Sequence, residues 1–120
     1  KESSAASDVY KRQVFADIGD DQSLENSLST FSSHVKNLTS IIRETNKSTL
    51  LLFDEIGSGT EPGEGAALAI AILEEVYQRG AITVATTHYN EIKNFSEQHP
   101  DFKNAAMQFN RHLNHFINWL

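Results

Sequence analysis

Two adjacent carboxylates follow a short run of large apolar residues near the middle of the chain. Residues 50–53 are all apolar, and Asp54 and Glu55 come directly after them. An apolar run of this length without polar alternation predicts a strand buried on both faces, as in a parallel sheet. The two acids would then lie at the sheet edge where open α/β folds bind ligands. This is the pattern of a Walker B segment, in which Asp54 would hold the Mg²⁺ shell of a nucleotide and Glu55 would polarise the attacking water.

The residues after the acids help to decide between this interpretation and a plain buried strand that ends at an acidic turn. A glycine-rich loop follows the acids, and Thr60 or Glu61 is expected to cap a helix. Pro62 suits the first helical position, and Gly80 suits its end. Residues 81–85 then predict a second strand.

A histidine follows this second strand. A strand, helix and strand joined by a right-handed crossover place both strand ends at the same edge of a sheet. His88, three residues beyond residue 85, is therefore expected near Asp54 and Glu55. A lone histidine is mostly structural or solvated, but a histidine beside a carboxylate pair is a candidate for sensing a γ-phosphate.

An amphipathic helix is expected upstream of the acids. Apolar residues recur there at helical spacing to about Thr45, and they include Leu28, Phe31, Val35 and Leu38. Ser29 or Thr30 suits the N-cap of this helix. An ordinary capped helix explains the pattern, but a serine-rich helix N-terminus also suits an anion, because free amides and hydroxyls converge there.

Together these elements resemble the MutS family of ABC-type ATPases, and within it the second bacterial lineage, MutS-two. The resemblance runs from Val14 to about Asn114 and rests on four ordered motifs: VFADIGD at 14–20, LSTFSSH at 28–34, LFDEIGSGT at 52–60 and ATTHY at 85–89. Mismatch-recognising MutS proteins share the Ser-Thr-Phe and Asp-Glu-Ile-Gly cores. The opening Ala-Asp-Ile-Gly-Asp and the Ser-Ser-His after the phenylalanine favour the second lineage.

The resemblance implies roles for the acids and for the upstream helix. Ser29 and Thr30 lie in the signature segment, which reaches across a dimer to the γ-phosphate bound by the partner. Asp54 corresponds to the Walker B acid, which contacts Mg²⁺ through water. Glu55 corresponds to the catalytic base.

The resemblance also implies a nucleotide-dependent homodimer. Residues 57–62 resemble the D-loop that joins two ATP sites, so Gly57 and Gly59 are expected beside ATP. His88 corresponds to the switch histidine, a second catalytic residue. In such a dimer two ATP molecules, each with Mg²⁺, lie between the subunits, and closure depends on nucleotide in both sites.

The expected fold class is therefore an α/β P-loop NTPase, as an ABC/MutS-type ATPase half-domain without its Walker A segment. No Gly-x-x-x-x-Gly-Lys-Ser/Thr occurs in the chain. Without that loop there is no nest of amides for the β-phosphate and no hydroxyl for Mg²⁺. We expect residues 14–114 to be the C-terminal part of the ATPase domain, with strands near 14–18, 49–54, 81–86 and 104–110, and to be inactive alone.

Both ends of the chain are expected to be foreign to this domain. Residues 3–13 match the in-frame translation of a widely used transposase sequencing adapter, so residues 1–13 are interpreted as a library artefact. Residues 115–120 are interpreted as a frameshifted tail. Deleting one C from codons for Pro-Phe-Tyr-Gln-Leu-Val yields the observed His-Phe-Ile-Asn-Trp-Leu.

The composition of the chain limits which partners it is expected to bind directly. The net charge of −6 disfavours direct DNA or RNA binding, which depends on phosphate neutralisation. DNA contacts are therefore expected outside this segment. The same holds for ribosome or rRNA contacts, if the parent rescues stalled ribosomes. The absence of cysteine agrees with a cytoplasmic location, and the longest apolar stretch is too short to cross a membrane.

The resemblance implies a parent that binds DNA, often carries a C-terminal nuclease domain and suppresses recombination. Two alternatives stay open at the level of sequence. One is a mismatch-recognising MutS repair ATPase, and the other is a non-enzymatic dimerisation fragment. A transporter ATPase is disfavoured because its Leu-Ser-Gly-Gly-Gln signature is absent.

Overall fold

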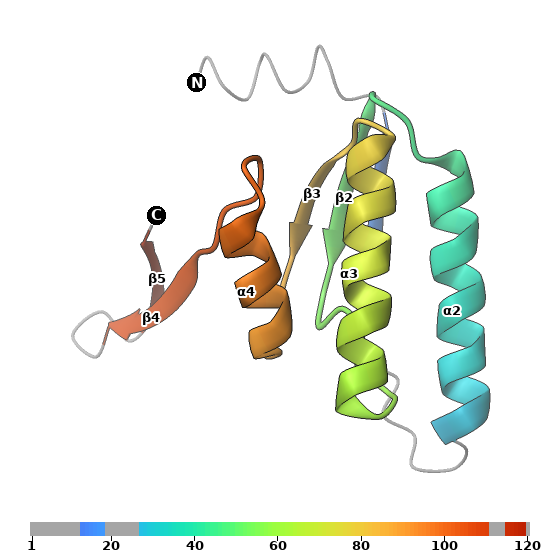
Figure 1. Ribbon diagram of the computed structural model, residues 1–120, viewed down its shortest axis with the longest axis horizontal. Helices are drawn as coiled ribbons and strands as arrows, with labels where there is room; N and C mark the ends of the chain where they lie inside the picture. The colour runs from blue at the N-terminus through green and yellow to red at the C-terminus, as the bar shows by residue number, and fades with distance from the viewer. Residues whose placement is uncertain (1–12, 19–26, 111–114, 120) are drawn as a thin grey trace. The chain divides into compact units, whose positions relative to one another are not determined.

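Three strands and two long helices alternate over the first part of the chain, in agreement with an α/β fold. The computed structural model describes residues 13–18, 27–110 and 115–119 (Figure 1). The chain divides into two units, residues 1–89 and 90–120, which are described separately. The first unit contains, in chain order, β1 (Gln13–Asp17), α2 (Ser27–Glu44), β2 (Thr49–Phe53), α3 (Pro62–Gln78) and β3 (Ile82–Ala85).

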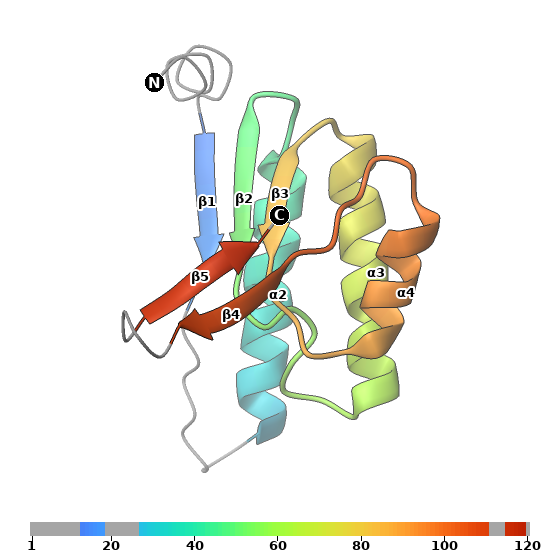
Figure 2. The ribbon, with the colours of Figure 1, turned by 90° about the vertical axis from the view of Figure 1, so that its left-hand side faces the viewer.

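The three strands form a parallel sheet with β2 in the centre. Leu51 of β2 pairs with Phe15 of β1 on one side and with Thr83 of β3 on the other. Figures 1 and 2 show α2 and α3 on the same side of this sheet. Because the strands are parallel, their carboxyl ends meet at one edge, as the sequence predicts.

Local signals define both ends of α3. Glu61 is the N-cap, and its side chain accepts a hydrogen bond from the backbone N–H of Glu64 at 3.1 Å. Pro62 opens the helix, where its missing N–H costs nothing. Gly80, with φ of 82°, follows the last turn in a conformation that glycine adopts readily. Buried apolar residues recur along one face of α3: Ala66, Ala69, Ile72, Leu73 and Val76.

Helix α2 begins three or four residues earlier than an N-cap at Ser29 or Thr30 would place its first helical residue. It starts at Ser27, so Ser29 and Thr30 lie inside its first turn and the prediction that either one is the N-cap is wrong. Leu28 already belongs to the helical apolar repeat, and this repeat favours helix over cap at these positions. Leu38 and Ile41 are buried farther along, and the helix ends at Glu44, as the apolar spacing predicts.

The two faces of the sheet differ in burial. On the helix-covered face Thr49, Leu51 and Phe53 are at most 3% exposed. On the opposite face Leu50 and Leu52 are half-buried, so the prediction that this strand is buried on both faces is wrong. Helices α2 and α3 pack on one side, so neither of them covers the other side. The open sheet face comprises six residues in register: Val14, Ala16, Leu50, Leu52, Ile82 and Val84.

The second unit contains one helix and one hairpin. Helix α4 spans Asn90–Gln98, and β4 (Ala106–Asn110) pairs antiparallel with β5 (His115–Trp119). Phe95 and Phe102 meet edge to face, with ring centroids 5.4 Å apart. The strand expected near 104–110 is therefore present as β4, whereas β5 was not predicted. Within the described ranges, no helix is long and apolar enough to cross a membrane.

Candidate active site

The parallel pairing of β2 with β3 brings the sequence-predicted acids and histidine together. Phe53 pairs with Ala85, and the backbone N–H of Thr86 donates to the carbonyl of Phe53 at 2.9 Å. The chain then continues beside the acids, where Nδ1 of His88 lies 4.0 Å from Oε2 of Glu55. The prediction that His88 lies near Glu55 is confirmed, and it follows from the crossover connection alone.

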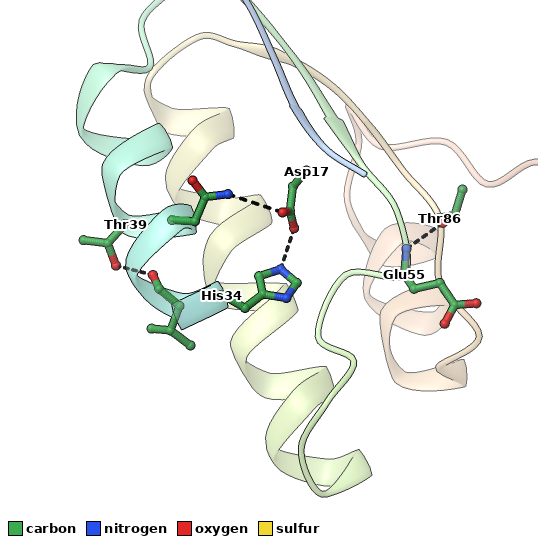
Figure 3. A network of polar contacts seen from close by, with 7 residues as sticks. Asp17, His34, Thr39, Glu55 and Thr86 are labelled. Carbon is green, nitrogen blue, oxygen red and sulfur yellow. Dashed lines mark hydrogen bonds and ion pairs between the residues drawn. The ribbon is translucent and has the colours of Figure 1, made fainter. Parts of the chain in front are cut away.

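Thr86 connects the two acids. Its hydroxyl donates a hydrogen bond to Oδ1 of Asp54 at 2.7 Å. The same hydroxyl accepts a hydrogen bond from the backbone N–H of Glu55 at 2.8 Å (Figure 3). A hydroxyl can do both at once, because it has one donor and two acceptor lone pairs. Thr86 therefore orients the Asp54 carboxylate and holds the backbone from which the Glu55 side chain departs.

Sequence reasoning did not single out Thr86. The available signal was its position: Thr86 comes directly after β3, and β3 is the neighbour of β2, the strand that leads into the two acids. Its partners lie more than thirty positions away in the chain. The contact depends on the register between β2 and β3, which no local motif contains.

Glu55 has an unusual backbone. Its φ of 50° lies in the left-handed region, and among the described residues no other non-glycine has a positive φ. That region costs an L-residue about 1–2 kcal/mol relative to the right-handed one. Such conformations concentrate at functional sites, where surrounding contacts hold them. Here the bond to Thr86 is one such contact, and the Glu55 side chain remains 58% exposed.

The loop after the acids packs backbone to backbone against α3. Gly57 has φ of 85°, and a Cβ added to it would lie 2.3 Å from the carbonyl oxygen of Gly65. The buried Tyr89 donates its hydroxyl hydrogen to the carbonyl of Gly57 at 3.3 Å. Gly59 has φ of 91°, but a Cβ there would meet nothing closer than Phe31, at 3.8 Å. Gly57 is thus required by close packing, and both glycines by backbone conformation.

The upstream helix reaches this loop at its first turns. Phe31 of α2 is the neighbour of Gly59, so the start of α2 and the loop lie close together. Ser29 and Thr30 belong to the first turn of the helix. Their side chains lie outside the described residues, so their expected contacts with nucleotide remain a prediction.

The donor set at the strand ends fits a magnesium ion held mainly by water and phosphate. Among the described residues no group of three or more histidine or acidic side chains could enclose a metal ion. One exposed carboxylate, Asp54, is held in place by Thr86. Mg²⁺ is usually bound by one or two carboxylates together with water and substrate phosphates, rather than by an all-protein cage. Asp54 therefore fits the expected contact through water.

An α/β unit that gathers an acid pair and a histidine at the carboxyl edge of a parallel sheet has the layout of a ligand-binding α/β domain. The family model described as MutS domain V matches residues 3–119, and the chain belongs to this family.

Three curated relatives to which the chain is similar carry the name Endonuclease MutS2. The protein of Shouchella clausii (strain KSM-K16) is 59% identical over 96 residues, which cover 80% of this chain and 12% of that protein. The protein of Geobacillus thermodenitrificans (strain NG80-2) is 60% identical over 98 residues, which cover 82% and 12%. The protein of Halalkalibacterium halodurans is 56% identical over 101 residues, which cover 84% and 13%.

These matches confirm the resemblance to the second MutS lineage. The chain spans about one eighth of the length of the curated relatives it matches. The relatives' names also favour this lineage over the mismatch-recognising one.

Proposed function

We propose that this chain is the C-terminal part of a P-loop ATPase domain in a MutS-two-like protein, and that it contributes to ATP hydrolysis at a homodimer interface. One observation carries the proposal. Asp54, Glu55 and His88 meet at the carboxyl edge of a parallel sheet, and Thr86 holds both acids. This geometry supports acid–base work on a bound nucleotide, because ligands of α/β sheets bind at that edge.

Each residue has a distinct proposed task. Glu55 accepts a proton from the attacking water, since its carboxylate is exposed at the strand end. Asp54 would hold Mg²⁺ through water, and Thr86 fixes the carboxylate of Asp54. His88 is proposed to donate a hydrogen bond to the γ-phosphate, and its position 4.0 Å from Glu55 supports this role. When bound with ATP, Mg²⁺ supplies neutralising charge at the β- and γ-phosphates.

The remaining parts of the site are proposed to come from three sources: the start of α2, the loop after the acids, and a phosphate-binding loop outside this chain. Ser29 and Thr30 at the start of α2 are proposed to face the nucleotide of the partner subunit, and the loop with Gly57 and Gly59 is proposed to lie between the two sites. The chain contains no phosphate-binding loop with its lysine. We therefore propose that the 120 residues alone do not hydrolyse ATP, and that the loop is supplied by another part of the parent polypeptide.

The parent is proposed to act on DNA. The name Endonuclease MutS2 on the relatives supports a DNA-binding ATPase that also carries a nuclease. The acidic net charge of this chain, −6, supports the proposal that DNA contacts lie in other regions. Control of recombination and rescue of stalled ribosomes are two proposed roles of the parent, and both would use the same ATP-driven closure.

A chimera tests the ATPase proposal. Residues 14–114 replace the matching segment of the Shouchella clausii relative, so that the rest of that polypeptide supplies the missing parts. We expect this domain chimera to hydrolyse ATP, and Glu55→Gln to slow the single-turnover rate by about 10²-fold, in line with loss of a positioned base. ATP binding should be preserved.

The matched control is Glu74→Gln, an exposed carboxylate on α3. It should leave turnover unchanged. Equal single-turnover rates for Glu55→Gln and the unaltered chimera would remove Glu55 from the role of base. A well-folded chimera without ATPase activity would instead favour the non-enzymatic dimerisation module.

A further inference from the structure

Asp17 lies at the same sheet edge as the acid pair and is bonded to it through the backbone. It is the last residue of β1, and its carbonyl oxygen accepts a hydrogen bond from the N–H of Asp54 at 2.9 Å. The position of Asp54 thus depends on where the end of β1 lies. Asp17 belongs to the motif at residues 14–20, but none of the proposed roles above uses it.

The side chain of Asp17 binds α2. Nε2 of His34 lies 2.5 Å from Oδ2 of Asp17, and Nδ2 of Asn37 lies 3.5 Å from Oδ1 (Figure 3). An ionised carboxylate only accepts hydrogen bonds, so Nε2 of His34 carries the hydrogen and donates it. The side chains of His34 and Asp17 are only 26% and 15% exposed. Partial burial strengthens such a charge-assisted bond relative to one at a fully exposed site.

These two contacts constrain α2 in a way that its apolar contacts do not. Leu38 and Ile41 bury apolar surface, which is non-directional and tolerates rotation or sliding of a helix. Hydrogen bonds require a defined distance and angle. His34 and Asn37 are three positions apart and therefore share one helix face, which they hold toward the end of β1.

The constrained part of α2 adjoins its first turn. Thr30 precedes His34 by four residues, so both positions lie on the same face, one turn apart. A rotation of α2 that broke the bonds to Asp17 would carry Ser29 and Thr30 with it. Phe31, whose ring would lie 3.8 Å from a Cβ added to Gly59, belongs to the same turns.

We propose that Asp17, His34 and Asn37 form a positioning latch that sets the rotation of α2 relative to the strand ends carrying Asp54 and Glu55. This inference rests on the proposed ATPase function. Asp17 links both parts, because its carbonyl holds Asp54 while its carboxylate holds the helix. The latch residues are positioning residues that act through Asp54 and through the first turn of α2.

Turnover in the domain chimera tests the latch. We expect Asp17→Ala and His34→Ala each to lower kcat by about 10-fold while the KM for ATP stays within about twofold, because small misplacements of reacting groups cost rate. The double variant should be no slower than Asp17→Ala alone, since that substitution already removes the bond to His34. His34→Gln should recover most of the rate, because its amide nitrogen can donate to the same carboxylate.

The control variant lies on the same helix. Thr39→Ala removes a hydrogen bond of 2.8 Å to the carbonyl of Val35 without touching Asp17, and kcat should stay within about twofold of the unaltered chimera because that bond is exposed. Additive effects of Asp17→Ala and His34→Ala, or equal losses in Thr39→Ala, would overturn the latch while leaving the ATPase proposal intact. An inactive unaltered chimera would overturn the ATPase proposal itself, and the inference with it.

A second measurement uses the 120-residue chain and no nucleotide. In Asp17→Ala, amide hydrogens in residues 31–38 of α2 should exchange at least about 10-fold faster, since docking of this segment is loosened. Those of β2 and β3 should change less. Unchanged exchange in residues 31–38 would overturn the latch whatever the chimera shows.

Discussion

Replacing Thr86 by valine should impair hydrolysis more than it impairs folding. Valine keeps the β-branched shape but removes the hydroxyl that contacts Asp54 at 2.7 Å and the N–H of Glu55 at 2.8 Å. A hydrogen bond to a charged group contributes about 1.5–3 kcal/mol, and the lower part of that range applies because these residues are exposed. A loss of about 1–2 kcal/mol of transition-state stabilisation corresponds to about a 10-fold fall in kcat.

The assay is single-turnover ATP hydrolysis by the domain chimera, with unfolding in urea measured in parallel. Thr86→Ser retains the hydroxyl and should restore most of the rate. Thr87→Val is the matched control. The hydroxyl of Thr87 accepts a hydrogen bond from the N–H of Tyr89, and no hydrogen bond to Asp54 or Glu55 is described for it. If Thr86→Val hydrolyses ATP within about twofold of the unaltered chimera, the hydroxyl does not position the acids and the reasoning fails.

Two further predictions concern the stability of the 120-residue chain, measured by urea unfolding. Gly57→Ala should lower the free energy of unfolding by about 2 kcal/mol or more, since a positive φ and a close backbone contact both oppose a Cβ. Gly59 also has a positive φ but lacks the close contact, so Gly59→Ala should lower the free energy of unfolding by only about 1 kcal/mol. Equal losses of stability in Gly57→Ala and Gly59→Ala would disprove the role of the contact. Glu61→Ala removes the N-cap of α3 and should cost about 0.5–1 kcal/mol, whereas Glu74→Ala on the same helix should cost less; a reversed order would argue against capping.

Elements with strong local signals were predictable from the sequence. The start of α3 follows from Glu61 and Pro62, and its end from Gly80, because each residue acts within one turn of its own position. The proximity of His88 to Glu55 was also predictable, because the parallel crossover places successive strand ends together.

Contacts that depend on how elements pack were not predictable. The bonds from Thr86 to Asp54 and from His34 to Asp17 join residues at least 17 positions apart, and each depends on strand register or on the rotation of a helix. The burial of β2 was overpredicted for a related reason. An apolar run indicates which residues avoid water, but Leu50 and Leu52 face the side of the sheet that neither α2 nor α3 covers.

The close approach of Gly57 to Gly65 has a mechanical consequence. At this point the loop meets α3 through backbone atoms, which have no rotamer to change and so cannot absorb a displacement. The hydroxyl of Tyr89, in the segment after β3, also donates a hydrogen bond to the carbonyl of Gly57. A displacement of the loop is therefore transmitted directly to α3. The loop and the helix should move together as one rigid body, along the whole length of α3.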